Sequence, residues 1–495
     1  MGDGPAPLQA EDSVSKFGND GRGAVKRAVV LAAGLLFGAG AATAQTTLAE
    51  ALANAYVESG LIEQNRAVLR AADEDVAQAV AALRPVVSWS SNIRRSFGTT
   101  GADQTSPLTG QTSFVERSSV DQTTGISLAA ELVLYDAGNR RLNIDLSKES
   151  VLATRADLVS VEQQVLLRAV QAFMEVRRAL DQVELRQNNT RVITQELRAA
   201  RERFEVGEVT RTDVALAEAR LSGTRSALAA AQGQLEQARA EYEAAVGDPP
   251  GGLVAPQGLP SIPPSIEQAQ RIALANHPDL EAVQHNVTAA ELGVMIAETA
   301  SKPRVSLRGE YGITENFDND DYSRSGTITL GASGPIYQGG ALPSQVRRAR
   351  AQRDQARAGL INTSRAIEQR VTNAYASLRV ARASIQATRD QVRAASVAFD
   401  GVREEATLGQ RTTLDVLDAE QELLDARNTL ISAQVDETIA AYAVLSAIGE
   451  LTARSLQLNV PIYDPSAYYS LVKDAPAGLS SQGRELDRVL EAIGR

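Results

Sequence analysis

The chain has 495 residues, no cysteine and a formal net charge of −11; 43% of its residues are hydrophobic but only 4% are aromatic. Without cysteine, the chain cannot form disulfides or a Cys-ligated zinc site, and it cannot carry a lipid on an N-terminal cysteine. The acidic balance argues against a nucleic-acid partner, which requires a basic face. Interspersed charges of both signs are typical of solvated helix surfaces.

Residues 1–44 have the pattern of an export signal. Basic residues precede an apolar run at 28–40 that is short for a membrane span. The small-x-small sequence Ala42-Thr43-Ala44 then predicts cleavage before Gln45. Residues 1–21 are longer than the basic part of such a signal needs, so translation that begins after them is an alternative. We expect an exported mature chain without a transmembrane helix; a retained signal anchor is the alternative.

The chain contains an internal repeat. A shift of 218 places Pro85 on Pro303, and a shift of 202 places Tyr135 on Tyr337. The 16 residues between the two shifts belong to the first copy, where we expect a polar loop at 98–119. The copies span 45–247 and 265–449. A Pro- and Gly-rich linker at 248–264 separates them, and residues 450–495 form a C-terminal equatorial segment and tail.

Each copy predicts a helix, two strands, a very long helix and a final helix. In the first copy these span 48–84, 86–97, 123–135, 139–206 and 208–246; in the second they span 266–302, 304–315, 325–337, 343–408 and 410–448. The long helices carry apolar residues at the three- and four-residue spacing of a coiled-coil seam. At 1.5 Å per residue, each would be about 100 Å long.

The four strand segments alternate apolar and polar residues over about ten positions, as transmembrane β-strands do. A small soluble sheet would show the same alternation locally. Four strands cannot close a membrane barrel, and open edges are not tolerated in lipid, so we expect three protomers to supply twelve strands. Five aromatic residues are candidates for the membrane interfaces: Trp89, Phe97, Tyr135, Tyr311 and Tyr337.

Over residues 46–465 the chain resembles the TolC family of outer-membrane efflux and type I secretion channels. The motifs that carry the resemblance are VLYDAG at 133–138, ALANHPDL at 273–280, GPIYQGG at 334–340 and LGQRTTLDVLDAEQEL at 408–423. The resemblance implies an α+β membrane protein that forms a homotrimer, with a 12-stranded barrel on a 12-helix tunnel. It also implies the outer membrane of a Gram-negative bacterium, lipid around the barrel, a periplasmic adaptor (membrane fusion protein), and an inner-membrane ABC or proton-coupled pump.

The turns at Gly207 and Gly409 are expected at the periplasmic tip of the tunnel. Arg411, Asp415 and Asp418 follow the second turn, and Asp213 is the first-copy counterpart of Asp415. In a trimer, Asp415 and Asp418 would form two carboxylate rings that favour cations; compensation of the helix N-terminus is the alternative. The resemblance implies that an Asp213–Arg411 pair holds the tip closed. Ala406 stands where the family often has a tyrosine, which would weaken the closed state.

Other chemistry is not expected. His277 and His285 are the only histidines, and no zinc-binding or phosphate-binding motif is present, so we expect no metal, cofactor or enzymatic activity. Two further classes remain open: a periplasmic adaptor and a structural coiled-coil scaffold. The sequence also leaves the cargo open between secreted proteins and small molecules.

Overall fold

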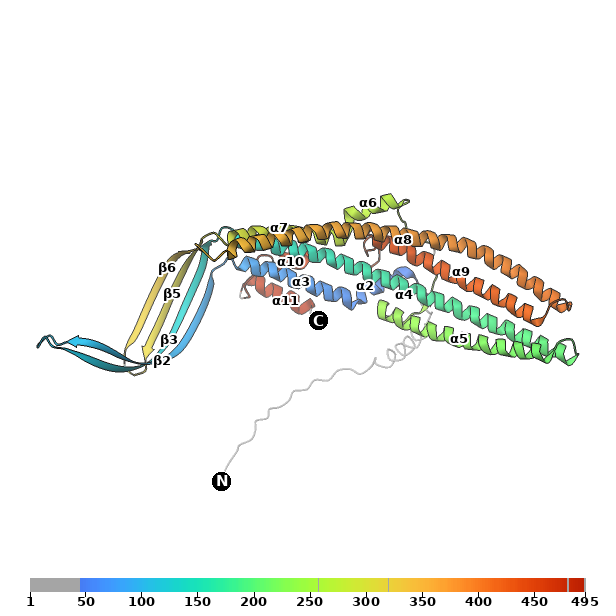
Figure 1. The fold of residues 1–495 in the computed structure, drawn as a ribbon, viewed down its shortest axis with the longest axis horizontal. Helices are drawn as coiled ribbons and strands as arrows, with labels where there is room; N and C mark the ends of the chain where they lie inside the picture. The colour runs from blue at the N-terminus through green and yellow to red at the C-terminus, as the bar shows by residue number, and fades with distance from the viewer. Residues whose placement is uncertain (1–44, 257, 319, 479, 494–495) are drawn as a thin grey trace, which may run out of the picture.

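The computed structural model describes residues 45–493 apart from 257, 319 and 479, so the predicted signal region lies outside the described residues. The molecule is elongated, with a sheet of strands at one end and helical hairpins running to the other (Figure 1).

Two helices of 67 residues form the length of the molecule: α4 (Asn139–Glu205) and α8 (Ala341–Thr407). Each is about 100 Å long at 1.5 Å per residue. Shorter helices pack along them: α3 (Gly60–Ala81) and α5 (Arg211–Val246) on α4, and α7 (Pro278–Thr299) and α9 (Thr413–Ala447) on α8. In each copy, two short helices therefore cover the length of one long helix.

The helices expected at 48–84 and 266–302 are each divided in two. The first forms α2 (Leu48–Glu58) and α3, because Ser59 is extended and its hydroxyl accepts a hydrogen bond from the N–H of Ile62. The second forms α6 (Ile266–Asn276) and α7, because His277 is extended and precedes Pro278, which disfavours a helical conformation at the residue before it. At both positions, a single residue interrupts the helix, while the spacing of apolar residues in the sequence continues across the break.

The four strands form one antiparallel sheet in the order β2 (Val86–Thr105), β3 (Thr112–Tyr135), β5 (Arg304–Asn316) and β6 (Tyr322–Ser333). The loop expected at 98–119 is wrong: both strands continue through it, and the turn occupies only 106–111. Paired hydroxyls join the strands there, with Thr99 Oγ1 3.0 Å from Ser118 Oγ. The β2–β3 hairpin therefore extends beyond β5 and β6 (Figure 1).

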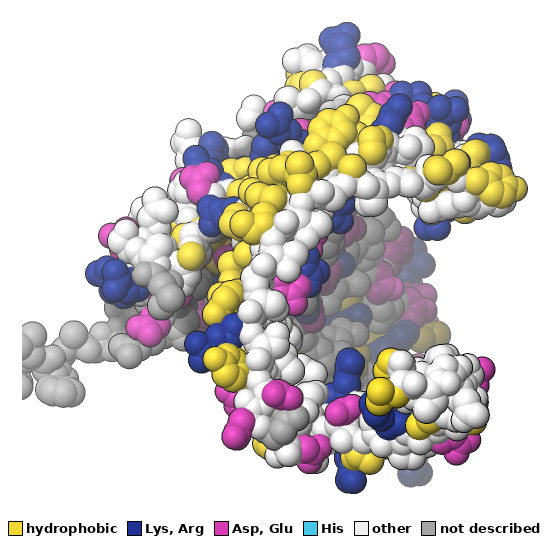
Figure 2. All heavy atoms as spheres, turned by 90° about the vertical axis from the view of Figure 1, so that its left-hand side faces the viewer, with side chains coloured by type: hydrophobic (Ala, Val, Ile, Leu, Met, Phe, Trp, Pro, Cys, Tyr) yellow, Lys and Arg dark blue, Asp and Glu magenta, His cyan; other side chains and the backbone are white. Residues whose placement is uncertain are grey.

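The strand register places the predicted apolar residues of all four strands on the same side of the sheet. One cross-strand row joins Trp89, Leu128 and Tyr311, and another joins Leu307 to Leu132 and Leu330. Many of these side chains are exposed in the protomer; Trp89 is 74% and Ile328 82% exposed. Figure 2 shows hydrophobic side chains following the curved sheet as a band. The opposite side carries Ser88, Ser90, Arg308 and other polar residues.

The main hydrophobic core lies around the middle of α4, where Phe173 and Tyr242 of α5 are fully enclosed. The linker and the C-terminal segment pack in the helical part. In the linker, β4 (Gly252–Leu253) pairs in parallel with β1 (Gln45–Thr46). After residue 460, α10 (Pro465–Val472) contacts α3 and is followed by α11 (Ser481–Ile493). The core thus joins both copies and the linker.

Candidate functional site at the helix tips and the sheet

The turns at the tip have the same construction in both copies. Gly207 and Gly409 adopt φ of 81° and 76°, a conformation that side-chain-bearing residues rarely take. A capping box then begins each returning helix. In the second copy, Asp415 Oδ2 accepts hydrogen bonds from the backbone N–H of Thr412 at 2.9 Å and from its hydroxyl at 2.8 Å. Asp213 makes the same contacts at the start of α5.

These contacts give Asp415 a local structural role at the helix start, as the alternative interpretation expected. The hydrogen bond from the backbone N–H of Thr412 lowers the pKa of Asp415, and the Arg411 charge adds to this. The carboxylate therefore stays ionised at neutral pH. Its side chain is only partly buried, so its charge still faces the solvent at the tip.

Arg411 bonds across its own turn within the protomer. Its Nε donates to Glu405 Oε2 at 2.8 Å, and both side chains are about half exposed. Within the protomer, the ion-pair partner of Arg411 is therefore Glu405, whereas the resemblance implied a pair with Asp213. Sequence analysis missed Glu405 because only the geometry of the turn brings these two residues, six positions apart, together.

Asp418 links the two copies. Its Oδ1 lies 2.6 Å from Arg220 Nη2 on α5. Further polar contacts between the copies join Arg178 to Asp436, Gln182 to Asn428, Asn189 to Glu420, and Arg403 to Glu196. Burial raises the pKa of Glu420, whose carboxylate accepts a hydrogen bond from the buried side chain of Asn189. Several polar contacts therefore connect the hairpins of the two copies over the part of their length that leads to the tip.

Ala406 is buried in a small apolar cluster near the tip. It packs with Phe399 and Val416, and its side chain is 4% exposed. The position is thus part of the contact between α8 and α9. A methyl group there contributes packing but offers no hydrogen bond to a neighbouring hairpin.

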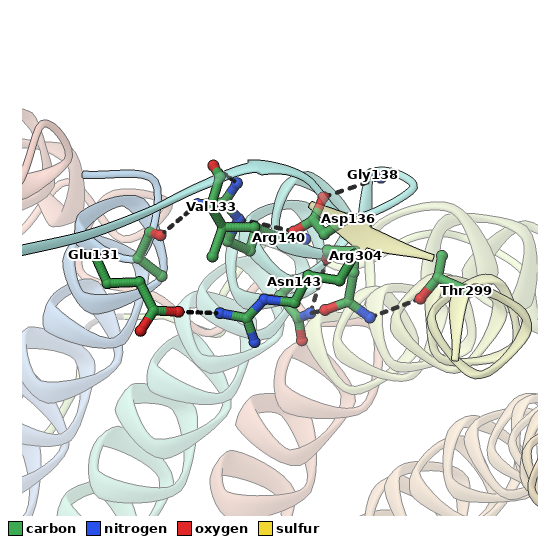
Figure 3. Close-up of polar contacts among 10 residues, drawn as sticks. Glu131, Val133, Asp136, Gly138, Arg140, Asn143, Thr299 and Arg304 are labelled. Carbon is green, nitrogen blue, oxygen red and sulfur yellow. Dashed lines mark hydrogen bonds and ion pairs between the residues drawn. The ribbon is translucent and has the colours of Figure 1, made fainter. Parts of the chain in front are cut away.

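A polar network fixes the junction between sheet and helices (Figure 3). Asp136 follows β3 and accepts hydrogen bonds from the N–H of Gly138 at 3.1 Å and from Arg140 Nε at 2.7 Å. Arg140 also donates to the carbonyls of Ala82 and Val133. Burial raises the pKa of Asp136, but the Arg140 hydrogen bonds and charge outweigh burial and hold the pKa below its ordinary value. The first turn of α4 is therefore anchored to the strand that precedes it.

The same network borders a cavity of about 730 Å³ at the base of the polar side of the sheet. Charged residues line it, including Arg84, Glu131, Lys302, Arg304 and Arg308. Arg304 Nη2 lies 3.3 Å from Glu131 Oε1 across the strands. A space lined by several charged side chains thus begins where the strands meet the helices.

The five aromatic residues predicted to lie at the membrane interfaces occupy different places in the structure. Trp89, Phe97 and Tyr311 lie on the apolar side of the sheet and are 74%, 82% and 53% exposed. Tyr135 pairs with Val305 beyond a β-bulge, at the end of the sheet near the helices. Tyr337 follows β6 and lies outside the strand, contrary to the expected range 325–337. Tyr322, which sequence analysis missed, stands on the apolar side at the far end of β6.

The family model described as "Outer membrane efflux protein" matches residues 51–248 and 270–450, which correspond to the two copies. Among curated relatives, outer membrane efflux protein BepC of Brucella suis is 36% identical over 91% of this chain and 96% of its own length. Alkaline protease secretion protein AprF of Pseudomonas aeruginosa is 26% identical over 76% and 79%. Outer membrane protein TolC of Escherichia coli is 25% identical over 60% and 63%.

Solved structures share the fold. The CmeC outer membrane channel of Campylobacter jejuni aligns with a TM-score of 0.69 and 18% identity, over 87% of this chain and 90% of its own. VceC of Vibrio cholerae aligns with a TM-score of 0.66 and 20% identity, over 81% and 96%. The expected fold class is thereby confirmed: an α+β membrane protein with strands and long helical hairpins.

Within the described ranges, none of the helices is both long and apolar enough to cross a bilayer. The family match covers most of the chain, and a relative 36% identical covers nearly all of it. The chain therefore belongs to the outer membrane efflux protein family and is, as its resemblance to TolC implied, an outer-membrane channel protein and not a periplasmic adaptor.

Proposed function

We propose that three copies of the chain assemble into one exit duct: a closed barrel of twelve strands in the outer membrane, continuous with a helical tunnel in the periplasm. The main support for this barrel is the four-stranded sheet. One side is apolar and exposed, and in the described protomer the outer edges of β2 and β6 have no strand partner. Lipid requires that backbone groups at such edges be paired. A ring of protomers pairs β2 of one copy with β6 of the next.

Engineered cysteines test this closure directly, because the chain has none of its own. Ser90 lies on the polar side of β2, and Ser323, Ser325, Thr327 and Thr329 lie on the polar side of β6. We expect Ser90→Cys, combined in turn with one of these four as Cys, to give covalent dimers and trimers on oxidation for the combination in register. Each single-cysteine variant serves as its control. Monomers in all four combinations would contradict the closed ring.

We further propose that the helix tips form the gate. In the closed trimer, Arg411 reaches Asp213 of a neighbouring hairpin, while its contact with Glu405 positions the guanidinium. Asp415 and Asp418 of the three copies line the entrance as carboxylate rings. Asp418 is exposed, Asp415 is partly exposed, and both follow the tip turn, which supports this arrangement. The absence of a tyrosine at position 406 leaves the closed state with fewer hydrogen bonds.

The duct acts passively, without catalytic activity, and is driven by an inner-membrane pump through a periplasmic adaptor. Support comes from relatives whose names state the process: BepC is an efflux protein, and AprF and PrtF are protease secretion proteins. We propose export of proteins by a type I system, of small molecules by efflux, or of both. Deletion of the gene, tested for secreted proteins and for drug susceptibility, separates these cargoes.

A further inference from the structure

Two arginines stand on the apolar side of the sheet. Arg95 lies two positions from both Ile93 and Phe97 on β2 and so shares their side of the sheet. Arg324 lies two positions from Tyr322 on β6 and shares its side. Their side is fixed by the register, since Arg324 lies opposite Ile313, which in turn lies opposite Ile126. Given the barrel proposed above, on which this inference rests, both guanidinium groups face the membrane and not the channel.

Both arginines lie at the same number of residues from the helical end of their strands. Arg95 is nine residues from Val86, and Arg324 is nine residues from Ser333, where the two strands meet the helical part. Nine residues span about 30 Å along a strand. With the usual tilt of barrel strands, this matches an apolar band about 25 Å tall. The arginines therefore lie at the outer rim of that band, at the level of the outer-leaflet head groups.

Among the described residues, no ion pair joins Arg95 or Arg324 to a carboxylate of the sheet. The ion pairs of the sheet in the described residues are Arg304–Glu131 and Arg308–Glu310, on strands β3 and β5. The guanidinium of Arg324 lies over the ring of Tyr322, 5.2 Å from its centroid. Glu315 is on the same side, opposite Tyr322 in the register. The guanidinium of Arg324 is thus stacked over an aromatic ring on the apolar side of the sheet.

The two arginines lie on the two edge strands, β2 and β6. When a ring closes, β2 of one protomer meets β6 of the next. Arg95 of one protomer and Arg324 of its neighbour then flank the same seam, and a trimer has three such seams. Two guanidinium groups on either side of one seam provide donors for a phosphate group, to which arginine donates paired hydrogen bonds.

We propose that Arg95 and Arg324 form an intersubunit site for the phosphate groups of a glycolipid in the outer leaflet. One lipid head group at each seam would bridge two protomers. The site offers positive charge above an apolar surface, which is what a phosphate-bearing head group with acyl chains requires. It would bind the lipid to the assembled trimer in preference to the protomer.

The test measures binding of diphosphoryl lipid A to the purified full-length protein in detergent, with excess inorganic phosphate present throughout. We expect the Arg95→Gln/Arg324→Gln double variant to bind at least tenfold more weakly than the wild type. Arg94→Gln is the matched control. Arg94 is the neighbouring residue but lies on the polar side of β2, so its replacement should leave the affinity within about twofold.

Equal affinities of the wild type and the double variant would overturn the inference, as would the absence of lipid A binding by the wild type in excess inorganic phosphate. Conductance in planar bilayers, recorded for the same preparations, separates this failure from failure of the duct. Unchanged lipid binding by variants that still conduct would refute the lipid site and leave the channel standing. A wild-type protein that is monomeric and does not conduct would refute both.

Discussion

Asp73 is buried in α3 without a hydrogen bond to either carboxylate oxygen, and Arg155 Nη2 lies 3.8 Å away. Burial raises its pKa from 3.8 to about 6, although the Arg155 charge opposes this. The folded protein therefore binds a proton more tightly than the unfolded chain. This contribution to stability is fully present below about pH 4 and is lost as the pH rises through about 6, at a cost of about 3 kcal/mol.

We predict that Asp73→Asn raises the thermal unfolding temperature at pH 7.5 and changes it much less at pH 5. The amide keeps the shape of the side chain and removes the charge that burial disfavours. Circular dichroism of the detergent-solubilised protein at both pH values measures this. Asp75→Asn is the control, because Asp75 is on the same helix but is exposed. An identical change at both pH values would show that Asp73 does not titrate in this range.

At the tip, replacing Asp415 and Asp418 by Asn should lower the preference of the channel for cations. Arg220→Ala should raise it, because it frees the Asp418 carboxylate from the ion pair at 2.6 Å. Single-channel reversal potentials in a salt gradient measure both effects. Asp425→Asn, farther along α9, should leave the potential unchanged. If neither change moves the reversal potential, the carboxylates are helix caps and bridges only.

Local signals at the residue scale could be predicted, but contacts between copies could not. A threonine followed three residues later by an aspartate marks the start of both returning helices, at Thr210 and Thr412. By contrast, Asp418 meets Arg220, 198 positions away in the chain. Such a pair depends on how the two hairpins lie side by side, and no spacing in the sequence encodes it.

At the scale of elements, Phe173 anchors α4 in the main core. Its side chain is completely buried, and its ring lies 6.4 Å from that of Tyr242 on α5. We predict that Phe173→Ala lowers the free energy of unfolding by about 3–5 kcal/mol, because it removes apolar contacts and leaves a cavity. Denaturant titration in detergent measures it. Phe204→Ala is the control, since Phe204 near the tip is 44% exposed; equal losses would contradict the assignment of the core.

The elements themselves were predictable in kind, and the errors have physical causes. Strong periodicity identified both long helices and all four strands, while the single-residue breaks at Ser59 and His277 left the apolar pattern intact. The Gly-, Thr- and Ser-rich stretch at 98–119 has the composition of a loop. It forms strands because the two arms pair along their full length, including the hydroxyl contact between Thr105 and Thr112.

At the scale of the whole molecule, the repeat predicted the architecture. Two copies, each with a strand pair inserted before a long helix, produce one sheet at one end and two hairpins at the other (Figure 1). The exposed apolar side and the two edges that lack a strand partner in the described protomer support the proposed assembly. In the proposed trimer, the edges join other copies of the chain, so the seams and the pairing of Arg411 with Asp213 are contacts between subunits.

The central claim, a trimeric duct gated at its helix tips, is tested most directly by planar-bilayer recording of purified protein whose mass has been measured in detergent. We predict a trimer of small conductance whose conductance rises sharply in Arg411→Ala, because that change removes the guanidinium at the closed tip. A monomer that does not conduct would contradict the account. A trimer whose conductance is unaffected by Arg411→Ala would contradict the gate.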